Sequence, residues 1–299
     1  LPGLLLRGGC LEMAEREKVT VRKIVSMKGK KRIVMVTAYD YPFARAVDEA
    51  GVDIILVGDS LGMTVLGLPS TLQVTMEDMI RHTAAVARAS PRALLVADMP
   101  FMSYEADLAS AVRNASEFLR VGADAVKIEG GSEYADVVKA MTRAGIPVMG
   151  HVGLTPQKHK LLGGYRLMGR THQEALEIVR DAEDIAEAGA FAVVIEYTAA
   201  EVAEVITRRL SVPTICIGSG PSCDGQVLVI HDILGLTPTP PPFAKAYVNL
   251  FEVIKGAVSS YRDEVERGAF PAPQNYWHMK EGELEKLLAA LESKGAQGS

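Results

Sequence analysis

The sequence predicts an α/β protein with a (β/α)8 TIM-barrel fold, in a single domain with an extra C-terminal helix. The chain has 299 residues, which suits a barrel of about 250 residues with extensions. Eight short apolar runs are separated, for the most part, by helical segments, and eight parallel strands close a barrel. A doubly wound open sheet is the alternative. Neither GxGxxG nor GxxxxGK(S/T), the phosphate-binding fingerprints that usually accompany such a sheet, occurs in the chain.

The expected strands are short and strongly apolar. Residues 54–57 are apolar throughout, as expected of a strand that is buried on both faces of a parallel sheet. The full set of expected strands is 33–38, 54–57, 93–97, 125–128, 146–151, 191–195, 213–217 and 227–230. The connection between the last two has no room for a full helix, which weakens the count of eight.

Helical segments lie between most of these strands and carry ordinary boundary signals. Pro42 suits the first turn of a helix that runs to Ala50, and Gly51 provides its C-terminal stop. A further helix opens at 75–78, and others are expected at 19–27, 105–121, 133–144, 173–188, 201–209, 243–267 and 281–292. Residues 153–170 hold no clear helix, and a loop of this length often acts as a lid.

Composition excludes several classes of protein. The chain is 48% hydrophobic and 23% charged, which is ordinary for a globular protein with a large core. A net charge of −5 and no basic stripe interleaved with aromatics argue against a nucleic-acid partner. No run approaches the roughly 20 apolar residues that span a bilayer, so no membrane partner is expected. Three cysteines without CxxC spacing fit a reducing compartment better than a disulfide framework, and we expect a cytoplasmic protein.

The domain boundaries follow from the same patterns. Residues 1–18 are expected to be a leader, either disordered or an artefact of a start site upstream of Met13. Residues 19–271 are expected to form the catalytic (β/α)8 barrel. Residues 272–299 are expected to form a helical C-terminal extension.

Acidic residues gather at the carboxyl ends of the expected strands. Those ends also carry a serine, a lysine and a histidine, and the residues concerned are Asp40, Asp59, Ser60, Asp98, Lys127, Glu129, His151, Glu196 and Asp232. In a barrel these ends meet at one mouth, where carboxylates repel one another unless a cation lies among them. Carboxylates with few His or Cys favour a hard ion such as Mg²⁺.

Each of these residues also has an ordinary structural interpretation. A single Asp after a strand is more often a helix N-cap or a turn former, and this applies above all to Asp40 and Asp232. Lys127 could extend outward to solvent, although it shares its side of the strand with Glu129, so both should point inward if either does. His151 is either a buried core histidine or a donor to an anionic substrate.

Longer strings resemble the ketopantoate hydroxymethyltransferase family. They are TAYD at 37–40, VGDSLGM at 57–63, HTAAV at 82–86, ADMPFM at 97–102, VKIEGG at 126–131, GHVGLTPQ at 150–157, DGQVLV at 224–229 and FAK at 243–245. The resemblance runs in order from about residue 19 to residue 271, nearly the whole chain.

The resemblance implies a (β/α)8 barrel related to phosphoenolpyruvate mutase and isocitrate lyase. The implied reaction transfers a hydroxymethyl group from 5,10-methylenetetrahydrofolate to 3-methyl-2-oxobutanoate and gives 2-dehydropantoate, with Mg²⁺ stabilising an enolate. It also implies a large homo-oligomer, with a decamer as the expected size. The implied site residues are Asp59, Asp98 and Glu129 at the metal, Asp59, Ser60, Asp98, Lys127 and His151 around the substrate, and Glu196 as the catalytic base.

The sequence departs from the family pattern at one informative place. Tyr197 and Thr198 follow Glu196 where the family commonly has a small apolar pair. Two alternatives stay open. One is a Mg²⁺-dependent 2-oxo-acid lyase or mutase of the same superfamily, although the Lys-Lys-Cys-Gly-His type of motif with an acid/base cysteine is missing. The other is a catalytically silent barrel that acts as a binding module, although all the implied acids are present.

Overall fold

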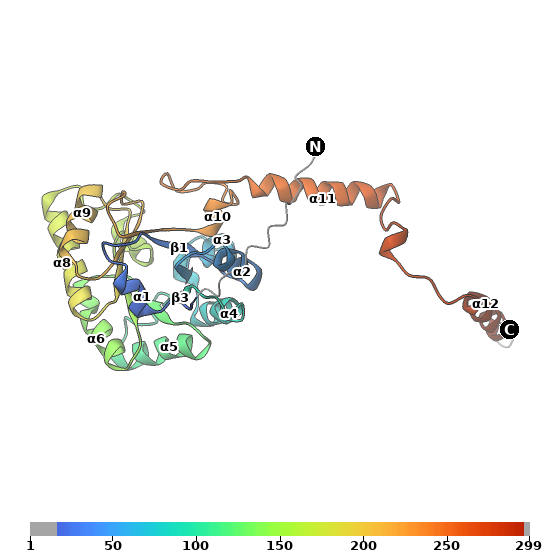
Figure 1. Ribbon diagram of the computed structural model, residues 1–299, viewed down its shortest axis with the longest axis horizontal. Coiled ribbons are helices and arrows are strands. Elements are labelled where there is room, and N and C mark those ends of the chain that lie inside the picture. The colour runs from blue at the N-terminus through green and yellow to red at the C-terminus, as the bar shows by residue number, and fades with distance from the viewer. Residues whose placement is uncertain (1–16, 296–299) are drawn as a thin grey trace. The chain divides into compact units, whose positions relative to one another are not determined.

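Eight parallel strands close into a barrel in the computed structural model, which describes residues 17–295 (Figure 1). The strands are β1 (Ile33–Thr37), β2 (Ile54–Val57), β3 (Leu94–Asp98), β4 (Ala125–Lys127), β5 (Val148–Gly153), β6 (Ala192–Glu196), β7 (Thr214–Ile217) and β8 (Gly225–Leu228). Each strand pairs in parallel with its neighbours in sequence, and β8 closes the ring against β1, with Val36 opposite Leu228. The predicted (β/α)8 barrel is therefore confirmed, and the open sheet is excluded.

Helices surround the strands (Figure 1). The α-helices of the barrel unit are α1 (Val21–Ser26), α2 (Tyr41–Glu49), α3 (Leu61–Thr64), α4 (Met76–Ala87), α5 (Leu108–Arg120), α6 (Ala135–Arg143), α7 (His159–Leu162), α8 (His172–Glu187), α9 (Ala200–Arg209) and α10 (Ile230–Ile233). Single 3₁₀ turns are η1 (Thr71–Gln73), η2 (Ser132–Tyr134) and η3 (Pro156–Lys158). Asp40 caps α2 by accepting from the backbone of Phe43, so its ordinary structural interpretation is confirmed.

The core has two layers because alternate residues of each strand face opposite sides. Ile54 and Leu56 belong to a cluster inside the barrel, whereas Ile55 and Val57 pack against the helices. Ile24 of α1 joins the inner cluster. Since Ala125 is also in the inner cluster, Lys127 two residues later lies on the inner side of β4, as the alternation predicts.

The structure corrects several predicted boundaries. β5 runs over Val148–Gly153, two residues later than the predicted strand at 146–151. β8 begins at Gly225, two residues before the predicted strand, because Gly225 and Gln226 pair with β1 despite lacking an apolar pattern. The segment 153–170 is not wholly irregular, since it contains η3 and α7. The helix expected from residue 243 begins at Leu250 as α11 (Leu250–Glu266).

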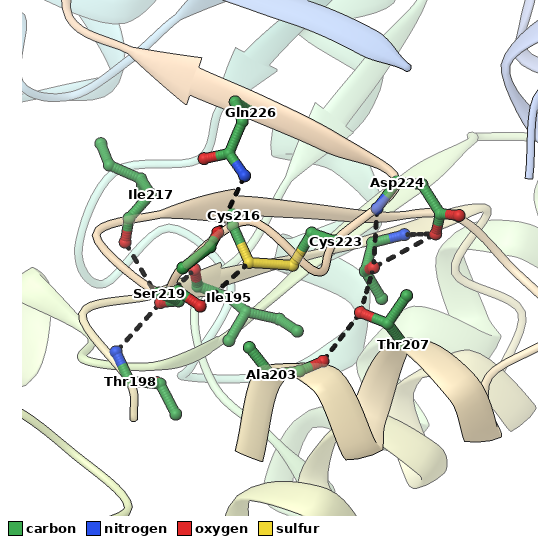
Figure 2. Close-up of a disulfide and its surroundings, with 12 residues drawn as sticks. Ile195, Thr198, Ala203, Thr207, Cys216, Ile217, Ser219, Cys223, Asp224 and Gln226 are labelled. Atoms are coloured by element: carbon green, nitrogen blue, oxygen red, sulfur yellow. Dashed lines mark hydrogen bonds between the residues drawn. A yellow bond between two sulfur atoms is a disulfide. The ribbon is translucent and has the colours of Figure 1, made fainter. Parts of the chain in front are cut away.

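A disulfide joins Cys216 of β7 to Cys223, in the turn before β8 (Figure 2). The expectation of reduced cysteines is therefore wrong for this pair. The sequence did not reveal it, because only the barrel brings the two Cα atoms, seven residues apart in the chain, to 5.7 Å.

The described residues divide into two compact units: residues 17–247, which contain the barrel, and a second unit that starts at residue 248. Its described part contains α11, η4 (Pro273–Asn275) and α12 (Glu283–Gly295), so a C-terminal helix is present. The sequence-based boundary after residue 271 stays a prediction. The leader expected at 1–18 lies, up to residue 16, outside the described residues. Within residues 17–295, no helix is both long and apolar enough to cross a membrane.

Candidate active site

One cavity at the carboxyl ends of the strands collects all seven residues that the sequence singled out for chemistry. Its volume is about 450 Å³. The seven residues in its wall are Asp59, Ser60, Asp98, Lys127, Glu129, His151 and Glu196. Gly58 helps to bring them together, because a Cβ there would lie 2.8 Å from Ser60 Oγ and 3.4 Å from Asp98 Oδ2. The sequence-based expectation of convergence therefore agrees with the geometry.

Asp98 and Lys127 form a buried ion pair at the floor of this cavity. Lys127 Nζ lies 2.9 Å from Asp98 Oδ1, and both side chains are about 5% exposed. The other oxygen, Asp98 Oδ2, accepts a hydrogen bond from the backbone N–H of Asp59 at 3.0 Å. Asp98 at the end of β3 thus connects β2 with β4.

His151 lies between two carboxylates. Its Nε2 is 3.3 Å from Glu196 Oε2, and its Nδ1 is 3.6 Å from Glu129 Oε1 and 3.2 Å from Lys127 Nζ. Burial and the charge of Lys127 both lower the pKa of His151, but the nearby carboxylates of Glu129 and Glu196 outweigh them and raise this pKa to about 9. Nδ1 can accept from Lys127 only while it is unprotonated, a state that the two carboxylates disfavour.

Two residues that the sequence did not single out orient the acids. Gln157 Nε2 donates to Asp59 Oδ2 at 2.9 Å, and the backbone N–H of Gln157 donates to Glu129 Oε2 at 3.0 Å. The hydroxyl of Tyr104 lies 3.0 Å from Gln157 Oε1 and 2.9 Å from the backbone oxygen of Glu129. Gln157 closes the string GHVGLTPQ just beyond β5, and this position after a strand end was the signal that could have revealed it.

Ser60 has a buried partner in Tyr39. Their hydroxyl oxygens are 2.9 Å apart, and either one can donate. Burial raises the pKa of Tyr39 to about 12, so its hydroxyl keeps its proton at neutral pH. Asp232, by contrast, lies inside α10, where Val229 is the N-cap, so it is neither a helix cap nor a turn residue; it lines the cavity and accepts a hydrogen bond from Thr237 Oγ1.

Negative charge is in excess around this floor. Burial, followed by the charges of Glu129 and Asp98, raises the pKa of Asp59 well above its usual value, and burial also raises the pKa of Asp98. Burial would raise the pKa of Glu129 as well, but the neighbouring His151 and Lys127 bring that pKa below its usual value. Even with Lys127 and His151 both protonated, the four carboxylates outnumber the cations. A further cation would relieve this repulsion.

The donor set fits a loosely held Mg²⁺ better than a cage of protein ligands. Within the described part of the chain, no three His, Cys, Asp or Glu side chains are arranged to hold one metal ion together. Mg²⁺ commonly uses only one or two carboxylates and completes its shell with water and substrate oxygens. Asp98 Oδ1, which is buried without a hydrogen-bond donor of good geometry, and the neighbouring Asp59 suit that mode.

The segment that follows β5 contributes one aromatic side chain, Tyr165, to the wall of the cavity. Tyr165 lines it, is 51% exposed and stacks on His159, with ring centroids 5.6 Å apart. Arg166 pairs with Glu174 at 2.7 Å, which ties this segment to α8. The predicted lid role of residues 153–170 stays a prediction.

Fold and cavity together define a (β/α)8-barrel protein whose mouth carries a buried cluster of acids, a lysine and a histidine. The sequence profile of the ketopantoate hydroxymethyltransferase family matches residues 18–273. This chain belongs to the ketopantoate hydroxymethyltransferase family.

Named relatives and solved structures agree with that assignment. A 3-methyl-2-oxobutanoate hydroxymethyltransferase of Hyperthermus butylicus is 68% identical over 96% of this chain and 100% of its own. One of Staphylothermus marinus is 61% identical over 90% of this chain and 100% of its own. A phosphoenolpyruvate phosphomutase from Streptomyces platensis has a TM-score of 0.57 at 16% identity and covers 93% of this chain and 99% of its own. A phosphonopyruvate hydrolase, solved with oxalate and Mg²⁺, has a TM-score of 0.54 at 15% identity and covers 92% and 98%. At these identities the solved structures support the barrel fold alone.

Proposed function

We propose that this protein transfers a hydroxymethyl group from 5,10-methylenetetrahydrofolate to 3-methyl-2-oxobutanoate and releases 2-dehydropantoate, a step toward pantothenate and coenzyme A. One observation carries the proposal. In a chain of this family, Glu196 faces the same cavity as Lys127 and the three buried acids. A base, a cation for the substrate carboxylate and a site for a metal ion are therefore within one small volume.

The roles of individual residues follow from their positions. Lys127 and Ser60 bind the carboxylate of the oxo acid, and Lys127 stays protonated because Asp98 and the other acids raise its pKa despite burial. Glu196, about a fifth exposed at the end of β6, takes the proton from C3 of the oxo acid. His151, 3.3 Å from the Glu196 carboxylate, orients that base. Asp59 and Asp98 hold Mg²⁺, water and substrate oxygens complete its shell, and Glu129, which the resemblance also implies at the metal, adds negative charge beside them.

A Mg²⁺ ion bound by these acids would act as a Lewis acid and stabilise the negative charge that develops on the keto oxygen of the substrate. The bond changes then balance. The C3–H electron pair forms a bond from C3 to the methylene carbon of the folate. Both carbon–nitrogen bonds of that carbon break, and the two nitrogens take up one proton from Glu196 and one from water. Water supplies the hydroxyl group, and tetrahydrofolate leaves. A closed lid formed by residues 153–170 would keep bulk water from the carbanion.

The assembly and the compartment belong to the same proposal. We expect a homo-oligomer, with a decamer as its size, located in the cytoplasm. Size-exclusion chromatography with light scattering would contradict the first if the protein eluted as a monomer.

The test of the proposal is product formation. Purified protein is incubated with 3-methyl-2-oxobutanoate, methylenetetrahydrofolate and Mg²⁺, and 2-dehydropantoate is measured by mass spectrometry with and without a chelator. We expect product only with metal, and a higher Mg²⁺ requirement for Asp98→Asn. No product in the wild type would contradict the proposal. Cleavage of an oxo acid without folate would instead favour a lyase of the same superfamily.

A further inference from the structure

Tyr197, the residue directly after Glu196, has an unusual backbone conformation. Its φ is +41°, in the left-handed region that non-glycine residues seldom adopt. Such a conformation costs free energy and persists only where the surrounding structure imposes it, and functional sites are where it concentrates. Because the strain sits beside the proposed base, it calls for an explanation in terms of function.

Hydrogen bonds on both sides impose this conformation. The backbone N–H of Tyr197 donates to Ile217 O at 2.8 Å, and its carbonyl accepts from Met168 N at 2.9 Å. The hydroxyl of Ser219 accepts from Thr198 N at 3.0 Å and donates to Ile195 O at 2.9 Å (Figure 2). The turn that contains the disulfide thus fixes the backbone around Tyr197, and its ring has a defined place.

That ring and the ring of Phe243 form one aromatic wall of the cavity. Both residues line it, and their ring centroids are 5.5 Å apart at an interplanar angle of 50°. Phe243 approaches the backbone so closely at Gly218 that a Cβ there would lie 2.5 Å from the Phe243 ring. Tyr197 and Phe243 are both partly exposed, and both line the cavity.

The cavity is larger and more apolar than a small oxo acid requires. The acids, Lys127 and His151 form a polar floor, and the remaining wall adds Leu154, prolines and the rings of Tyr165, Tyr197 and Phe243. A volume of about 450 Å³ lies in the range of sites that take much larger ligands. The floor suits the oxo acid, which leaves the aromatic wall for the second substrate.

We propose that Tyr197 and Phe243 bind the planar ring of the one-carbon donor, stacking on the pyrimidine part of its reduced pterin. This inference rests on the proposed function, since it assigns a place to the second substrate of that reaction. Stacking of planar heterocycles on aromatic side chains is a common mode of recognition and depends little on hydrogen bonding.

The test is calorimetric binding of tetrahydrofolate, which carries the ring but no transferable carbon. Tyr197→Asn removes the ring and keeps a residue that tolerates φ > 0, whereas Tyr197→Phe keeps the ring. We expect Tyr197→Asn to weaken tetrahydrofolate binding about tenfold or more. Tyr197→Phe should stay within about twofold of wild type. Phe243→Leu provides a second loss of ring without touching the strained backbone and should also weaken binding. Tyr41→Asn, the same change on a tyrosine outside the cavity wall, is the matched control.

Binding of 3-methyl-2-oxobutanoate with Mg²⁺ is measured on the same samples. We expect the Tyr197 and Phe243 variants to keep it, which shows that the floor is intact. The inference is overturned if Tyr197→Asn and Phe243→Leu bind tetrahydrofolate as wild type does, if Tyr197→Phe is as weak as Tyr197→Asn, or if both ligands are lost together. Wild type that binds the oxo acid but no tetrahydrofolate also overturns it. Wild type that binds neither ligand contradicts the proposed function itself.

Discussion

The side chain of Gln157 donates a hydrogen bond to Asp59, with 2.9 Å between Gln157 Nε2 and Asp59 Oδ2. The same amide nitrogen also donates to Met99 O at 3.0 Å, so its direction is fixed. Gln157 is only 3% exposed. Asp59, which we propose binds the metal ion, is thereby held in place by a neutral donor that adds no charge to a crowded site.

Gln157→Glu should damage this arrangement. A carboxylate cannot donate to Asp59 and adds another negative charge next to it, so Asp59 is no longer held in place. We expect the Mg²⁺ concentration that gives half-maximal activity to rise roughly 10–100-fold. A metal titration of product formation measures the effect. Gln173→Glu, the same change at an exposed position of α8, is the control and should behave as wild type. An unchanged titration for Gln157→Glu would remove Gln157 from the set of positioning residues.

The Cys216–Cys223 disulfide should stabilise the part of the barrel where β7 pairs with β8. Both cysteines are fully buried, and their bond closes a short loop, for which chain-entropy estimates give roughly 2–3 kcal/mol. We expect Cys216→Ala/Cys223→Ala to unfold roughly 5 °C lower in calorimetry. Thiol titration of the denatured, unreduced wild type should detect one of the three cysteines. Three reactive thiols would show that the bond does not form.

Asp224 should make stability depend on pH. Its carboxyl accepts from Lys28 Nζ at 2.8 Å and from the backbone N–H groups of Thr214 and Gly29. Burial alone would raise the pKa of Asp224, but these bonds bring it below its usual value. Because the pKa is lower in the folded state, the stabilisation is complete above the unfolded pKa of about 3.9 and is lost as pH falls through the folded pKa.

Asp224→Asn therefore should cost about 2 kcal/mol of unfolding free energy at pH 7, the scale of hydrogen bonds to a charged group. Its deficit relative to wild type should shrink below about pH 4. Denaturant unfolding at several pH values measures this. A deficit that stays constant down to pH 2 would mean that the charge of Asp224 contributes nothing.

Local patterns predicted much of the fold, because each strand of a barrel is buried on both faces and shows itself as an apolar run. β2 is observed as predicted, at Ile54–Val57. β8 was misplaced since Gly225 and Gln226 carry no apolar signal and enter the strand only through pairing with β1. The start of α11 was placed too early at residue 243, because Phe243 belongs to the aromatic wall of the cavity rather than to a helix.

The candidate site was predictable to the extent that it lies on strand ends. Asp59, Asp98 and Glu196 end or directly follow strands, so the barrel brings them together. Gln157 lies in a 3₁₀ turn outside any period, and its contact with Asp59 joins residues 98 positions apart in the chain. Similarly, nothing in the local sequence indicated that Cys216 and Cys223 face each other. Such contacts arise only from tertiary structure.

The central claim is that Glu196 removes the C3 proton of 3-methyl-2-oxobutanoate. The most direct test is deuterium exchange at C3, followed by NMR in deuterated buffer with Mg²⁺, with and without folate, for wild type and Glu196→Gln. The amide is nearly isosteric but cannot accept a proton, so we expect Mg²⁺-dependent exchange in wild type and a loss of at least about 100-fold in the variant. Full exchange in Glu196→Gln, or none in wild type, would contradict the account.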